Sequence, residues 1–264
     1  MNGEFRTVRC ELREGDTLSL AVEDAPGDVS PYTLPADLPL DVLFEDEWVT
    51  AVNKPAGMPA HPSHGHRLDT VSNALAFRYS DRYYVFRPVN RLDRDTSGCM
   101  LTSNSRDASY KMYEAMTAGK IKKTYIAVAD GIFGEKEGRI DAPVARSQTS
   151  IITRRVDPSG KPASTGYRVI AEGDGRSLLV LRPLTGRTHQ IRVHLSHIGH
   201  PVTGDDMYGT RSEAIGRQAL HCVLTSFPHP ATGETETVFA PLFPDMEELI
   251  KTDFPDVDLK EEIL

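Results

Sequence analysis

The alternation of apolar and polar residues along the chain predicts several short strands. Residues 41–54 alternate on both sides of an acidic turn and indicate two strands that end before a proline. In residues 122–131 the alternation places Tyr125 on the face opposite Ile126. Residues 177–183 form a continuous apolar run, which is typical of a buried strand.

Apolar residues spaced three and four apart predict three helices. Residues 68–80 show this spacing, and so do residues 105–119, where Ser105 is a good N-cap and Gly119 can end the helix. The third helix spans residues 188–199. Because the strands cluster without regular β-α-β alternation, we expect an α+β domain built on a central, largely antiparallel mixed sheet flanked by helices.

The first forty residues differ in character from the rest of the chain. Two short strands are expected within residues 1–25, joined by a turn at residues 13–16. Residues 26–40 are proline-rich and have no periodicity, as in a linker. We therefore expect an N-terminal extension at residues 1–40 and one main domain at residues 41–264.

The charge is distributed unevenly along the chain. The net charge is −8; residues 1–48 hold twelve acidic and three basic residues, and residues 245–264 hold eight and two, which leaves +7 in residues 49–244. A basic centre between acidic ends suits a polyanion held in a central cleft, with residues 245–264 as an acidic tail. A solvated surface without a partner is the alternative.

The cysteine content and the hydropathy of the chain indicate where in the cell the protein is found. The three cysteines, Cys10, Cys99 and Cys222, are far apart and odd in number, so they indicate reduced thiols rather than a disulfide framework or a zinc site. The N-terminus lacks an apolar secretory segment, and no stretch approaches the roughly 20 apolar residues of a membrane span. We expect a cytoplasmic protein with no membrane partner.

Residues 89–98, VNRLDRDTSG, surround carboxylates with cations and small hydroxyl residues. Pro88 and the Thr-Ser-Gly turn predict that Asp93 lies on a loop entering a strand, where functional side chains concentrate. Asp93 is therefore a candidate reactive carboxylate. Asp95 would serve equally well in a surface ion pair, however, and a solvated charge cluster is the alternative.

Residues 186–194, GRTHQIRVH, carry more hydrogen-bond donors than solubility requires. Gly186 permits a ligand to approach the backbone closely, and the N-terminus of a helix favours anions. Binding of phosphate or carboxylate groups is one interpretation, and a solvated helix face is the other. The nearby lysines at 120, 122 and 123 also favour a polyanion, because they would crowd one another without one.

Two further stretches invite a metal site. HPSHGH at residues 61–66 holds three histidines with only Asp69 as a neighbouring acidic ligand, and GDDMYG at residues 204–209 resembles an acidic magnesium pair. Contact with an RNA backbone or a plain, rigid loop explains the first stretch better, and an ordinary turn between glycines explains the second. No metal is therefore expected.

Five stretches follow one another in an order that resembles the RluA-type pseudouridine synthase family, over about residues 40–244. The family's hallmark is His-Arg-Leu-Asp-x-x-Thr-Ser-Gly, which bears its catalytic aspartate. Asn90 stands here in place of the histidine; it keeps a donor and an acceptor but cannot titrate, so we expect a structural replacement. The five stretches are NKPAGMPAHP (53–62), NRLDRDTSG (90–98), KKTYIAVADG (122–131), GRTHQIRVHLSHIGHPVTGDDMYG (186–209) and LHCVLTSFPHPATGE (220–234).

The resemblance implies a pseudouridine synthase fold with a catalytic cleft, and an enzyme that isomerises a specific uridine of ribosomal or transfer RNA without a cofactor. Asp93 would act at the glycosidic bond, and Arg192 would pair with it and keep it ionised. Tyr125 would stack on the uracil beside the departing carbon-5 proton, and Arg91 would replace the flipped base in the RNA stack. The other candidates for contact with RNA are Lys54, Lys123, Arg187, His189 and Gln190.

Two alternatives stay open. One is an RNA-binding protein on the same scaffold that has lost catalysis, and the other is a nucleoside hydrolase, against which the long basic surface argues. Residues 1–25 resemble only the final strands of the small RNA-binding module that the family often carries, so the extension looks like a truncated module. We expect the protein to be a monomer.

Overall fold

The computed structural model describes residues 11, 13–17, 24, 26–30, 33–148, 150 and 152–263. Most of the two strands expected within residues 1–25 therefore lies outside the described residues. The turn expected between them is present. The Arg13 amide donates to the Asp16 carboxylate at 2.8 Å, and the Asp16 amide donates to the Arg13 carbonyl at 3.1 Å.

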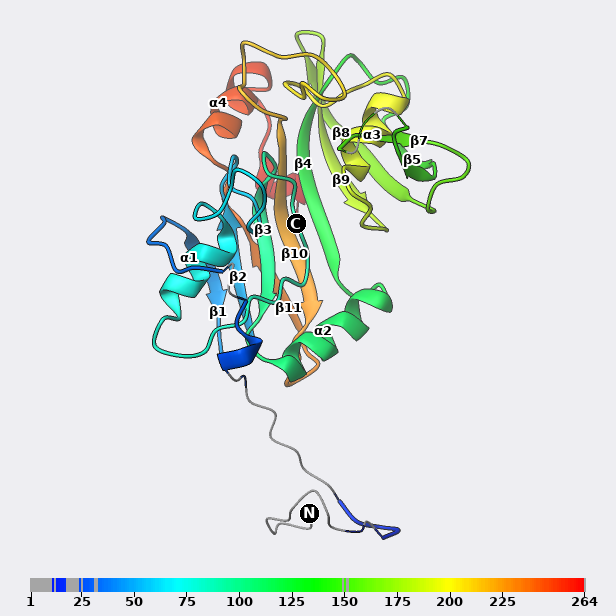
Figure 1. Cartoon of the computed structure of the whole chain (residues 1–264). Coiled ribbons are helices and arrows are strands. Elements are labelled where there is room, and N and C mark those ends of the chain that lie inside the picture. Colours follow the sequence, from blue (N-terminus) through cyan, green and yellow to red (C-terminus); the bar gives the residue numbers. More distant parts are fainter. Residues whose placement is uncertain are drawn as a thin grey trace.

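A mixed sheet forms the centre of the domain (Figure 1). Within the described residues it has nine strands in the order β1-β2-β3-β10-β4-β9-β8-β5, with β11 paired to β10. Every pairing is antiparallel except that of β3 with β10, so the expected largely antiparallel sheet is confirmed. The strands are β1 (Asp41–Glu45), β2 (Val49–Lys54), β3 (Ser97–Ser103), β4 (Lys122–Asp130), β5 (Glu137–Asp141), β8 (Ser164–Gly173), β9 (Arg176–Pro183), β10 (Leu220–Pro228) and β11 (Thr235–Phe239).

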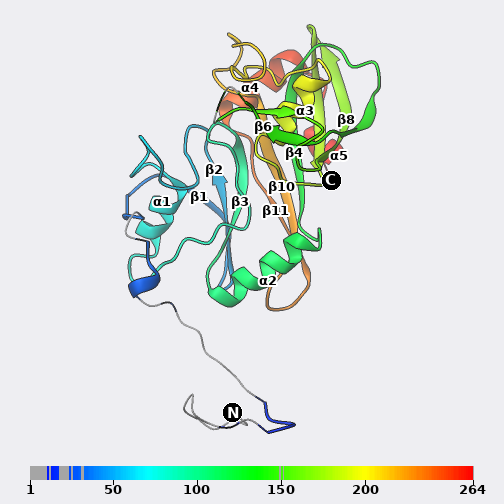
Figure 2. The same cartoon turned by 45° about the vertical axis from the view of Figure 1, so that its right-hand side comes forward.

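Short helices and one separate hairpin surround the sheet. Figures 1 and 2 show α1 beside β1 and β2, α2 at the lower end of β4, and α3 beyond β9 near the hairpin. None of the helices in the described part of the chain has the length and apolar character needed to cross a membrane. The elements are α1 (Val71–Arg78), α2 (Arg106–Thr117), α3 (Gln190–His197), α4 (Pro244–Asp253) and α5 (Leu259–Ile263), the 3₁₀ turn Pro26–Asp28, and the hairpin strands β6 (Val144–Arg146) and β7 (Arg154–Val156).

The helix starts follow from the capping residues. The Ser105 hydroxyl accepts from the Ala108 amide at 3.1 Å, so α2 begins at the expected position, and Gly119 ends it with a φ of 66°. In α3 the expected start is wrong by two residues. His189 has a φ of 56° and lies outside the helical region, so α3 begins only at Gln190.

The prediction that residues 245–264 form an acidic tail is wrong. Residues 244–253 and 259–263 form α4 and α5, and their apolar side chains are buried in the main core. Arg217 holds α4 in place, because its guanidinium pairs with Asp245 at 2.6 Å. The apolar positions in this segment have helical spacing, but the many acidic residues between them led us to predict a tail instead of helices. The buried residues are Met246, Leu249, Ile250, Phe254 and Ile263.

The parallel contact of β3 with β10 depends on a glycine. Gly98 has a φ of 111°, and a Cβ atom at this position would overlap the backbone of Cys222 on β10. Only glycine accepts both the conformation and the close approach. Because β3 lies tightly against β10, the loop that precedes it is directed over the face of β4, where the cleft described below opens.

Candidate active site

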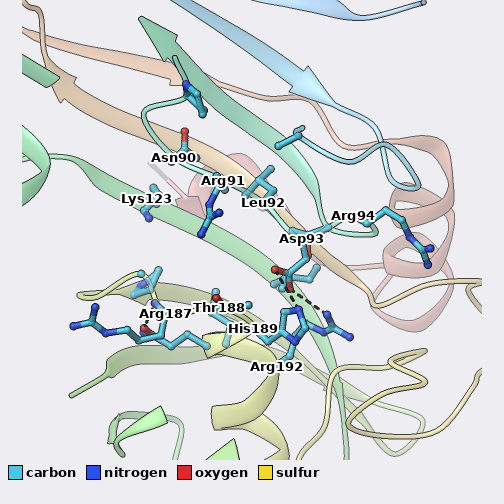
Figure 3. A pocket seen from close by; sticks show the side chains of 18 of the residues that line it. Asn90, Arg91, Leu92, Asp93, Arg94, Lys123, Arg187, Thr188, His189 and Arg192 are labelled. Atoms are coloured by element: carbon cyan, nitrogen blue, oxygen red, sulfur yellow. Dashed lines mark hydrogen bonds and ion pairs between the residues drawn. The ribbon is translucent and has the colours of Figure 1, made fainter. Parts of the chain in front are cut away.

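A cleft of about 750 Å³ opens between the loop before β3, the face of β4 and the start of α3 (Figure 3). Among the described residues that line it, six carry a basic side chain and only Asp93 carries a carboxylate. A cavity with this balance of charge attracts an anion. The basic residues are Arg91, Arg94, Lys123, Arg154, Arg187 and Arg192.

Asp93 lies on the loop that leads into β3, as expected. Leu92 beside it is only 8% exposed and anchors the loop in the core, and the Thr96 amide donates to the Asp93 carbonyl at 3.2 Å. The Asp93 side chain is 23% exposed and remains accessible from the cleft. Arg192 Nη1 donates to Asp93 Oδ2 at 3.1 Å, so the structure brings together two residues that lie 99 positions apart.

Arg192 is held from two sides on α3. Its side chain is 5% exposed, and it donates from Nε and Nη2 to the two oxygens of Asp205 at 2.6 and 2.8 Å. Burial alone would lower the pKa of Arg192, but the hydrogen bonds and charge of Asp205, together with Asp93, raise it above its ordinary value. Arg192 is therefore a fixed cation beside a carboxylate that the cleft exposes.

Asp205 is a functional candidate that the sequence did not reveal. Its side chain is fully buried, and it also accepts from the Met207 and Tyr208 amides at 3.0 and 3.1 Å. The turn expected in GDDMYG is therefore present, but Asp205 within it also forms a buried ion pair with Arg192. The neighbouring Asp206 is exposed and lies 3.6 Å from Arg211. No spacing in the sequence connects Asp205 with Arg192.

His189 lies beside the carboxylate rather than on the outer wall of the cleft. Its Nε2 is 3.9 Å from Asp93 Oδ1, and its Nδ1 shares a hydrogen bond of 2.7 Å with the Tyr208 hydroxyl. Burial lowers the pKa of His189 and outweighs the opposing effect of Asp93. The imidazole is consequently neutral at neutral pH and adds little positive charge next to Asp93.

Tyr125 lies on β4 in register with Cys222 of β10 and lines the cleft. Its side chain is 7% exposed. Burial raises the pKa of Tyr125 well above 10, and Cys222 and Asp93 raise it further. The side chain is therefore an uncharged phenol.

A basic wall, formed by Arg91, Lys123 and Arg187, lines the cleft beside this centre. Figure 3 shows Arg91, Lys123 and Arg187 around one side of the cavity. Arg91 is exposed, and Arg187 Nε donates to the Pro162 carbonyl at 3.0 Å. Burial lowers the pKa of Lys123. These three residues stay candidates for contact with RNA.

Comparison with known proteins assigns the site to a family. Residues 49–197 match the family of RNA pseudouridylate synthases, and an uncharacterized RNA pseudouridine synthase of Bacillus subtilis, YjbO, is 42% identical over 95% of this chain and 89% of its own length. The chain belongs to the RNA pseudouridylate synthase family. Membership favours catalysis over the alternative of an inactive RNA-binding scaffold.

Further members agree over most of the chain. Ribosomal large subunit pseudouridine synthase D of Pasteurella multocida is 37% identical over 100% of this chain and 86% of its own. The solved structure of human RNA pseudouridylate synthase domain containing 1 aligns with a TM-score of 0.67 and 28% identity, over 80% of this chain and 87% of that chain. The pseudouridine synthase fold expected from the resemblance is therefore confirmed.

Two of the positions expected to contact RNA are unsuited to that role. Lys54 is fully buried, and its ammonium donates to three carbonyls, including that of Arg94 at 2.8 Å in the loop of Asp93. Burial lowers the pKa of Lys54 to about 7. Gln190 is 4% exposed, and its amide joins α3 to Ser164 and Thr165 of β8. Both expectations are corrected, because these side chains hold the synthase scaffold together.

The histidine loop that invited a metal lies at the rim of the cleft. His61 lines the cleft with its ring edge-to-face against Phe86 at 5.0 Å, and His66 pairs with Asp69 at 2.6 Å. In the part of the chain that the structure describes, three or more histidine, cysteine or acidic side chains do not gather in a way that could hold a metal ion.

Asn90 forms a structural link in place of the family's histidine. It is 6% exposed; its Oδ1 accepts from the Leu101 amide at 2.7 Å, and its Nδ2 donates to the Cys99 carbonyl at 3.4 Å. Both bonds fix the loop of Asp93 to β3. This geometry supports a structural replacement and gives the side chain no part in proton transfer.

We expect Asn90→His to retain turnover within about threefold, because an imidazole can also accept from one neighbour and donate to the other. Asn90→Ala should lower the free energy of unfolding by about 1–3 kcal/mol, since it leaves two buried backbone groups unpaired. Turnover assays and chemical denaturation of both variants measure these effects. A more than tenfold rise in turnover for Asn90→His would instead mean that a titratable group is missing from the natural chain.

Proposed function

We propose that this enzyme converts a specific uridine of large-subunit ribosomal RNA into pseudouridine, with Asp93 as the reactive carboxylate. The contact between Asp93 and Arg192, in a cleft whose other charged side chains are basic, carries the proposal. The ribosomal substrate follows the printed names of several relatives, such as the Pasteurella multocida enzyme. A cytoplasmic location, a monomer and a reaction without a cofactor remain predictions from the sequence.

The reaction moves one bond and one proton. The uracil leaves carbon 1′ of the ribose through N1, turns, and returns through carbon 5; the carbon-5 proton is lost, and N1 gains one. No oxidant, reductant or second substrate is consumed. Asp93 acts at the sugar, either by adding to carbon 1′ until carbon 5 displaces it, or by taking a proton from carbon 2′ and returning it when carbon 5 bonds to carbon 1′. Arg192 holds this carboxylate in position and balances its charge while the bond to N1 breaks.

Tyr125 supports the detached base. A uracil next to Asp93 can contact the phenol, because Tyr125 lines the same cleft from β4, which pairs with β10. Because Tyr125 is uncharged, its oxygen can take the carbon-5 proton only while its own proton moves on. Asp93 is the carboxylate of the cleft lining that can receive it, so we assign the two residues to one relay.

The basic wall positions the RNA. Extracting a stacked uridine costs a few kcal/mol, which contacts to the RNA must offset. Arg91 is exposed at the cleft and suited to fill the place of the extracted base. Lys123 and Arg187, on the same side of the cavity, are suited to phosphates next to the target.

Tritium release tests the function directly. Wild-type enzyme is incubated with transcripts of large-subunit ribosomal RNA or transfer RNA labelled at carbon 5 of uridine. We expect release from the ribosomal transcript and a matching pseudouridine in sequence mapping of RNA from cells with and without the gene. Release from transfer RNA alone would contradict the proposal of a ribosomal substrate. No release from any RNA would mean that the protein only binds RNA, and free uracil in the product would indicate a hydrolase.

A further inference from the structure

Helix α2 exposes large side chains along one ridge. Tyr110 is 62% exposed, Tyr113 is 69% exposed and Met116 is 37% exposed. Their spacing of three residues places them on successive turns of the same side. The other side of α2 already supplies Ala108 and Met112 to the core, so the fold itself does not require the two tyrosines.

The ridge leads into the cleft. Met116 belongs to both, since it lines the cleft one turn beyond Tyr113. After α2 the chain turns into β4 (Figure 1). Lys123 and Tyr125 of this strand also line the cleft. The exposed tyrosines thus continue the wall of the active site outward along the surface.

The charges along this surface favour an anion at its inner end. Asp107 is paired with Lys111 at 3.0 Å, and the Glu114 carboxylate accepts a hydrogen bond from the Tyr110 hydroxyl. Lys120 and Lys122 are exposed, and neither forms an ion pair with another described residue. A polyanion that leaves the cleft past Met116 therefore meets two available cations and then two aromatic rings.

We propose that the ridge Tyr110–Tyr113–Met116, together with Lys120 and Lys122, binds unpaired nucleotides that flank the target uridine. Exposed tyrosine rings stack on bases of any sequence, and neighbouring lysines bind the phosphates between them. Continuity with the cleft and the unpaired lysines favour RNA over a protein partner. The inference rests on the proposed function, because the strand that it binds is the one whose uridine occupies the cleft.

Binding of a fluorescein-labelled 12-nucleotide oligouridylate, followed by anisotropy, tests the ridge. Tyr110→Ala/Tyr113→Ala should weaken binding at least about fivefold, and Tyr113→Phe should bind within twofold of wild type because the ring remains. Lys120→Ala/Lys122→Ala should reduce the slope of log affinity against log salt by about 1.4, for two lost phosphate contacts on a single strand. Tyr83→Ala is the matched control, since Tyr83 is 60% exposed and lies outside the cleft lining.

Tritium release by the same variants separates this inference from the proposed function. If wild type releases tritium from labelled ribosomal transcript and the double tyrosine variant has the same affinity and the same KM, the ridge inference is wrong and the function stands. The ridge inference would also be wrong if the double tyrosine variant bound RNA as wild type does but lost binding to a protein partner. If wild type itself releases no tritium, the proposed function fails, whatever the ridge binds. All four positions are exposed, so unfolding midpoints within about 2 °C of wild type confirm that the variants fold.

Discussion

Asp93→Asn should abolish pseudouridine formation and leave affinity for RNA within about twofold of wild type. The amide has nearly the size of the carboxylate and can still accept a hydrogen bond from Arg192, but it has no charge to act at the sugar. Loss of a residue that reacts with the substrate commonly lowers kcat by on the order of 10⁴-fold or more. Tritium release measures the first effect, and RNA binding by anisotropy measures the second.

Asp95→Asn is the matched control on the same loop. Asp95 pairs with the exposed Arg94 at 2.8 Å and does not line the cleft, so turnover should stay within about threefold. Equal losses for the two variants would mean that the loop needs its negative charge rather than one reactive carboxylate. Turnover above one hundredth of wild type for Asp93→Asn would exclude Asp93 as the reactive group.

Asp205→Asn should lower kcat by about 10²- to 10³-fold with little change in KM. Asp205 is fully buried and has no contact with the cleft, so its effect must pass through Arg192. With an amide at this position, one charge that fixes the guanidinium is lost, and the misplaced cation no longer holds Asp93 for reaction. Removing one partner of a buried ion pair also costs about 3–5 kcal/mol of stability.

The experiment on Asp205→Asn must separate the loss of kcat caused by a misplaced Arg192 from the loss of folding stability. Turnover is therefore recorded at a temperature where denaturation curves show the variant to be folded, with Asp206→Asn as the exposed neighbouring control. A lowered unfolding free energy with unchanged kcat would show that Asp205 serves the fold alone.

The sequence predicted those elements whose pattern is local. Ser105 and Gly119 mark α2 because capping depends on residues within one turn, and alternation marks β4 in the same way. The helices α4 and α5 escaped prediction because acidic residues dominate their composition. Strand β8 escaped as well, since Ser164–Gly173 mixes small, polar and apolar residues without a clear period.

The site could be predicted only in part. The pairing of Asp93 with Arg192 came from a resemblance to a family, because nothing in the spacing joins residues so far apart. Lys54 was assigned to RNA through the same resemblance, whereas here three carbonyls compensate its burial. Asp205 was not predicted as a site residue, because an ordinary turn adequately explains an aspartate that lies between glycines.

The position of β10 between β3 and β4 has a consequence for synthesis of the chain. The two strands that carry the loop of Asp93 and Tyr125 leave the ribosome first, but the strand that separates them is completed only at Pro228. Until then the sheet cannot close, and such non-local pairing is slow to form. A nascent chain therefore exposes its basic middle region before the loop of Asp93 and Tyr125 are joined through β10.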